Sequence, residues 1–83
     1  MIEQIAKRLK LLRFALDITA EDVALQINYS ANQIWRVERE TCKPNIDFVA
    51  KICKVYGVSI DLLVYGTDKD FQKLINEIYS QTA

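Results

Sequence analysis

The sequence predicts an all-α domain of five helices with a sixth helix appended at the C-terminus. Its 83 residues include only two glycines and one proline, so the loops must be short. Apolar residues recur at steps of three and four along most of the chain, as on the buried side of helices. Serine, threonine or asparagine stands before most of these stripes, where such residues cap helices.

The amino-acid composition limits the functional classes to which we expect the protein to belong. Eleven basic and eleven acidic residues balance, so a positive surface for nucleic acid would have to be local. The chain has no histidine, and its two cysteines, Cys42 and Cys53, form no CxxC pair, so we expect no metal and no cofactor. The sequence contains neither a Gly-rich phosphate loop nor paired carboxylates, the motifs that would indicate an enzyme. Without an uninterrupted apolar stretch at the N-terminus, we expect a cytoplasmic protein that does not enter the membrane.

The first expected helix begins at Ile2. Its apolar stripe consists of Ile5, Leu9, Leu12 and Leu16. Basic residues within 7–13 flank this stripe, and apart from Arg13 we expect them to be solvated. Asp17 follows, a residue type that tolerates a left-handed turn.

The second and third helices are joined by a very short connection. Thr19 can cap a helix over about 20–27, with Asp22 as its reciprocal partner, and Ser30 can cap the next, which fades near Glu40. Asn28 suits the left-handed turn between them. The expected buried residues are Val23, Ala24, Ile27, Ile34 and Val37. A connection of about three residues is typical of a helix-turn-helix.

Three more helices follow a loop at residues 41–44. Asn45 caps the first, which ends at Gly57; Ser59 caps a short helix over 60–64, which Gly66 closes. Thr67, with Asp70 three residues on, opens the last. The expected stripes are Ile46, Val49, Ile52, Cys53 and Tyr56 in the fourth helix, and Phe71, Leu74, Ile75 and Ile78 in the last.

One long pattern combines turn, cap, core and loop positions. It comprises residues 18–24, 29–30, 36–39 and 56–63, together with Ile34 and Pro44. Across roughly residues 3–65, in register and without gaps, it resembles the phage-repressor-like (XRE) helix-turn-helix family. The resemblance implies a five-helix lambda-repressor-like DNA-binding domain, here residues 1–66, and a transcriptional regulator that reads a palindromic operator in double-stranded DNA.

The resemblance also implies residue roles. The third helix would lie in the major groove, with Ala31, Asn32 and Arg36 reading bases. Residues that would contact or flank the DNA backbone are Thr19, Glu21, Gln33, Trp35, Arg39, Thr41 and Lys43. Arg13 and Glu38 would form a structural ion pair between the first and third helices.

Some positions depart from the family pattern and favour an alternative. Ala20 stands where the family commonly has a phosphate-binding glutamine, and Glu40 where it has glycine. Leu25 and Trp35 lie on faces that are polar in most members, as at an interface. The alternative is a protein-interaction module that kept the fold but weakened or lost DNA binding.

The last helix, within residues 67–83, could lay its stripe on its own domain or against a second copy. A palindromic site calls for a two-fold pair, and no other segment is an obvious dimerisation element. We therefore expect Phe71, Leu74, Ile75 and Ile78 to form a homodimer interface. A regulatory partner protein is a further expected partner.

Overall fold

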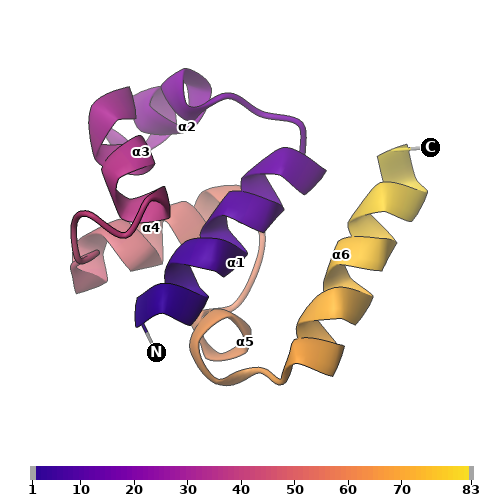
Figure 1. Cartoon of the computed structure of the whole chain (residues 1–83). Coiled ribbons are helices and arrows are strands. Elements are labelled where there is room, and N and C mark those ends of the chain that lie inside the picture. The colour runs from indigo at the N-terminus through magenta and orange to yellow at the C-terminus, as the bar shows by residue number, and fades with distance from the viewer. Residues whose placement is uncertain (1, 83) are drawn as a thin grey trace.

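The computed structural model describes residues 2–82, and every regular element in that range is an α-helix (Figure 1). Met1 and Ala83, the ends of the two predicted segments, lie outside the described residues. The helices are α1 (Ile2–Ala15), α2 (Ala20–Ile27), α3 (Ala31–Glu38), α4 (Ile46–Tyr56), α5 (Ile60–Tyr65) and α6 (Asp68–Thr82). The predicted all-α fold with an additional C-terminal helix is confirmed.

One hydrophobic core holds all six helices together. α1 lies centrally and packs against α3, α5 and α6, while α2 packs against α3 and α4 (Figure 1). Leu9, Leu12, Val23 and Ile34 are almost completely buried in this core. Leu16, expected on the stripe of the first helix, lies just after α1 and is only half-buried.

The predicted N-caps and left-handed turns are present, although the reciprocal bond expected from Asp22 to Thr19 is not among the hydrogen bonds at the start of α2. The side chains of Thr19, Ser30, Asn45 and Ser59 each accept a hydrogen bond from a backbone amide three residues on. Asp17 and Asn28 have φ angles of 57° and 61°, the left-handed conformation expected of them. These local signals set the short connections that place α2 beside α3.

The prediction of the buried stripe of α4 is wrong at one residue. Ile46 is 78% exposed, whereas Phe48, which was not predicted to be buried, is 3% exposed. Ile46 is the first residue of α4, and the buried side of the helix runs through Phe48, Val49 and Ile52 instead. The ring of Phe48 meets Tyr29 edge-on, with ring centroids 5.2 Å apart.

The dimer interface expected on the last helix is also wrong. Phe71, Ile75 and Ile78 are buried in the chain's own core, and Leu74 packs against it half-buried. The stripe is covered because α6 lies alongside α1 (Figure 1). Phe71, Ile75 and Ile78 are therefore not available to a second copy of the chain, and Leu74 is only partly available.

Arg8 links α1 to α5 and to the start of α6. Its guanidinium donates to the carbonyls of Leu62, Leu63 and Gly66, at 3.1, 3.0 and 2.8 Å. It also pairs with Asp68 at 3.2 Å and lies 5.1 Å from the ring centroid of Phe71. Arg8 is 3% exposed, so the expectation of a solvated basic cluster is wrong for this residue.

Candidate nucleic-acid interface

α2 and α3 form a compact unit in which one side of α3 remains free. α2 ends at Ile27 and α3 begins at Ala31, and the left-handed Asn28 turns the chain between them. α3 buries Ile34, Val37 and Glu38. Because these residues occupy one side of an eight-residue helix, the side chains at the remaining positions face outward.

The outward face of α3 carries two cations and an amide. Asn32, Arg36 and Arg39 follow each other at steps of four and three, and all three are exposed. Ala31, the third expected base reader, is half-buried and packs against the core. The structure therefore brings Asn32 and Arg36 together on a free surface and leaves Ala31 at its edge.

Gln33 helps to fix the start of α3. Its side-chain oxygen accepts a hydrogen bond from the Ser30 amide at 2.8 Å, and the Gln33 amide donates to the Ser30 hydroxyl at 3.2 Å. This reciprocal capping box pins the first turn of α3. The side-chain oxygen of Gln33 is thus already engaged, which leaves its NH₂ group to face a ligand.

Trp35 lies toward α1. Its side chain is 40% exposed and lines a groove of about 370 Å³ together with Lys10, Arg13, Glu38 and Arg39. Gln33, in contrast, lines a hollow beside the loop that follows α3. The two residues that flank the outward face thus border different surfaces.

The loop after α3 closes that helix and exposes a further cation. The amide and the hydroxyl of Thr41 both donate to the carbonyl of Arg36, at 2.9 and 3.0 Å. Glu40 has a φ angle of 64°, which is costly for a residue with a Cβ atom. The hydroxyl proton of Thr41 is used within the fold, while Lys43 is exposed next to it.

The start of α2 contributes little side-chain surface. The Thr19 hydroxyl accepts from the Asp22 amide at 3.1 Å, and Ala20 is buried at 1% exposure. Glu21 is exposed in the first turn. Because Ala20 points into the core, this position has no side chain that could reach a phosphate.

The ion pair between α1 and α3 is present. Arg13 Nε donates to Glu38 Oε2 at 2.7 Å, and Arg13 Nη2 donates to Glu38 Oε1 at 3.0 Å. Both residues are 8% exposed, and the hydrogen bonds with Glu38 raise the pKa of Arg13. This two-bond geometry fixes α3 relative to α1 and therefore orients the outward face.

Arg8 and Lys10 are the two residues whose surroundings sequence reasoning missed. Arg8 lies three residues after Ile5 and four before Leu12, which places it on the apolar side of the helix. That spacing was a signal for its burial. The place of Lys10 beside α3 depends on how two helices pack, and a periodicity within one helix cannot reveal it.

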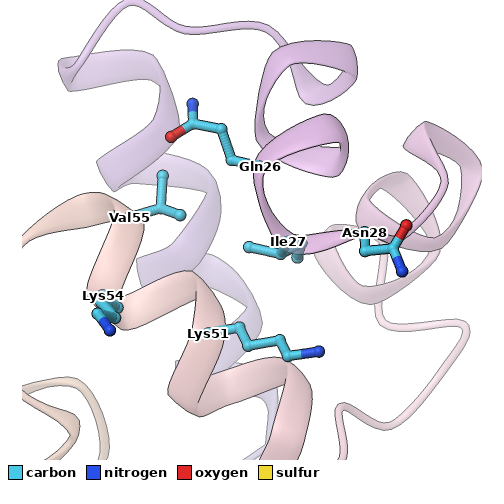
Figure 2. A pocket seen from close by; sticks show the side chains of 6 residues that line it. All are labelled: Gln26, Ile27, Asn28, Lys51, Lys54 and Val55. Carbon is cyan, nitrogen blue, oxygen red and sulfur yellow. The ribbon is translucent and has the colours of Figure 1, made fainter.

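A separate hollow lies between α2 and α4. It is lined by Gln26, Ile27, Asn28, Lys51, Lys54 and Val55 (Figure 2). Figure 2 shows Lys51 extending toward the end of α2, with Lys54 on the next turn of α4. Lys51 already pairs with Asp47 at 3.3 Å and lies over the ring of Tyr29. Because Lys51 is engaged within the fold, this hollow has less free positive charge than its two lysines indicate.

Comparison with known protein families identifies most of the chain. The family model described as a helix-turn-helix domain matches residues 4–64, which include α2, α3 and the groove beside Trp35. No curated protein and no solved structure matches the chain at a significant level.

Among residues 2–82, no helix combines the length and the apolar character needed to cross a membrane.

Proposed function

The chain belongs to the helix-turn-helix domain family, and on that premise we propose that it is a sequence-specific DNA-binding transcriptional regulator of the phage-repressor-like (XRE) type. In this proposal α3 enters the major groove. Asn32 pairs with adenine and Arg36 with guanine, the bases whose edges match these side chains, and Ala31 contributes a methyl contact. The protein occupies an operator in the cytoplasm and thereby blocks or recruits polymerase.

The observation that supports this function best is the free face of α3. Asn32, Arg36 and Arg39 project from a helix that is fixed by a capping box at its start and by the Arg13–Glu38 pair at its end. Base reading requires side chains held in register by a rigid support, because a misplaced donor loses its bidentate contact. Lys43 and Arg39 would hold backbone phosphates beside this face.

A palindromic operator would be read by two copies of the chain related by a two-fold axis. Because the apolar stripe of α6 is buried, we propose that the homodimer uses surface outside that stripe. Sedimentation of the free protein, followed by the protein-to-duplex stoichiometry, tests this arrangement. A single copy bound per selected duplex would contradict it.

Selection of bound duplexes from a random pool tests the function directly. We expect enrichment of a defined sequence, with affinity falling steeply as salt rises because cations released from the phosphates drive binding. The same salt titration on the unselected pool measures the sequence-independent part of the DNA affinity. The absence of duplex binding at low salt would contradict the proposal.

A protein-interaction module is the second candidate, and a specific observation favours it. Leu25 on α2 is 82% exposed, and no core contact accounts for so large an apolar side chain. A contact with another protein would cover this side chain. In a regulator, the same surface would receive a regulatory partner protein, so Leu25→Ser should leave DNA affinity unchanged in the first proposal.

A further inference from the structure

We propose that α1 supplies a second contact to the DNA backbone: Lys10 and Arg39, which line the groove between α1 and α3 together with Trp35, hold a phosphate there. This inference rests on the proposed function, and it adds an element that the resemblance did not assign. Lys10, the residue of α1 that makes this contact, was expected to face solvent only.

The charge of the groove fits an anion. Three cationic side chains line the groove, those of Lys10, Arg13 and Arg39, together with one carboxylate, that of Glu38. The carboxylate is satisfied by two hydrogen bonds from Arg13, at 2.7 and 3.0 Å. Lys10 and Arg39 are therefore the cations of this groove that the carboxylate does not neutralise, and both are exposed. A phosphate oxygen could accept from either side chain.

Aromatic rings support the cations of the groove. Phe14 is 53% exposed and lies beside two of these cations. Its ring centroid lies 5.9 Å from Lys10 Nζ and 4.9 Å from Arg13 Cζ. Cation–π contacts of this kind restrain a lysine that would otherwise sample many rotamers. Phe14 thus restrains Lys10, which lines the groove together with Trp35.

The groove lies where a backbone would pass. A helix inserted in the major groove has one phosphate backbone on each flank, about 12 Å apart. One flank of α3 faces the loop with Lys43, and the other faces α1 through Trp35. Arg13 also donates to the carbonyl of Ile18 at 3.1 Å, so the start of α2 lies next to the same groove. The backbone on this flank would therefore meet Lys10.

Lys10→Gln tests the groove, and Lys7→Gln is its matched control. Lys7 is on the same helix one turn earlier, but it lines the separate groove between α1 and α6. With the selected duplex, the slope of log affinity against log salt should become shallower for Lys10→Gln, by at most about 0.9, the value of one whole phosphate contact, because Arg39 remains beside that phosphate. The slope for Lys7→Gln should stay at the wild-type value.

Single neutral methylphosphonates, placed in turn along the duplex, identify the phosphate itself. One position should weaken binding by the wild-type protein more than binding by Lys10→Gln, because that variant has already lost the Lys10 part of the contact and keeps only Arg39. If Lys10→Gln has the same salt slope and the same DNA affinity as the wild type, the inference is overturned. The groove would then be a candidate site for an acidic protein segment instead. Equal losses from Lys7→Gln and Lys10→Gln would also overturn it, since they indicate only general attraction.

The two proposals fail in different ways. If the wild-type protein binds no duplex at low salt, the proposed function and the groove contact fall together. If the wild-type protein binds its selected duplex while Lys10→Gln changes nothing, the regulator proposal stands and only the contact from α1 is lost.

Discussion

Arg13 on α1 and Glu38 on α3 are joined by two parallel hydrogen bonds of 2.7 and 3.0 Å. Both side chains are almost completely shielded from solvent. The same guanidinium donates to Ile18, just before α2. One arginine therefore connects the three elements that must keep a fixed geometry if α3 is to fit into a DNA groove.

Removing one partner of this pair should be costly. Glu38→Ala leaves the Arg13 guanidinium buried without its carboxylate, and we expect a loss of about 3–5 kcal/mol in the free energy of unfolding. Urea unfolding followed by circular dichroism measures it. The control is Lys51→Ala, which breaks the exposed pair with Asp47 and should cost at most about 1 kcal/mol. Similar losses in both variants would contradict a structural role for the buried pair.

Arg8 should control the docking of α6. Arg8→Met keeps an apolar side chain over Phe71 but leaves the carbonyls of Leu62, Leu63 and Gly66 without this donor. We expect a loss of about 1.5–3 kcal/mol, because these hydrogen bonds come from a charged donor. Amide hydrogen exchange should accelerate in α6 more than in α2. Lys7→Met is the matched control, and unchanged exchange in Arg8→Met would show that α6 is held by its apolar stripe alone.

Replacing Glu40 by glycine and replacing it by glutamine should have different effects on stability. Glu40→Gly relieves the left-handed backbone and removes a negative charge near the loop with Lys43, so both stability and DNA affinity should rise. The gain in stability is expected to be about 0.5–1 kcal/mol, which is the cost of the left-handed conformation for a residue with a Cβ atom less the conformational entropy that glycine loses on folding. Glu40→Gln removes only the charge and should raise affinity without stabilising the fold. Thermal unfolding and duplex titration separate the two effects, and equal stability of the two variants would argue against backbone strain.

The contact between Tyr29 and Asp47 predicts a pH dependence. The Tyr29 hydroxyl donates to Asp47 Oδ2 at 2.8 Å, and this bond, followed by the one from Lys51, lowers the pKa of Asp47. The contact therefore stabilises the fold above the ordinary carboxyl pKa, and this stabilisation is lost as pH falls through the lowered value. In Tyr29→Phe the pKa of Asp47 should rise, as measured by NMR titration of its carboxyl carbon. An unchanged titration would mean that Lys51 alone sets it.

The fold was predictable wherever the signal is local. Asp17, Asn28, Thr19 and Ser30 mark turns and caps through their own backbone chemistry, and the structure has each of them as expected. Periodicity erred at Ile46, because the first residue of a helix can lie on the edge of its stripe. A pattern of steps of three and four does not say where the buried side begins.

Longer-range placement was less predictable. The α6 stripe was read correctly as apolar, but a stripe does not identify the surface that covers it, and here that surface is α1. For the candidate site, the outward position of Asn32 and Arg36 follows from helical spacing. The packing of Trp35 beside Lys10 depends on how α3 sits against α1, which no residue of either helix specifies alone.

Arg36 provides the most direct test of base reading by α3. The affinities of the wild type and of Arg36→Ala should be measured on the selected duplex and on a random one at the same salt concentration. Arg36→Ala should weaken binding to the selected duplex by about 1–3 kcal/mol and relax preference at one base pair, with a smaller loss on random DNA. Equal losses on both duplexes would contradict the account, because Arg36 would then contact only the backbone.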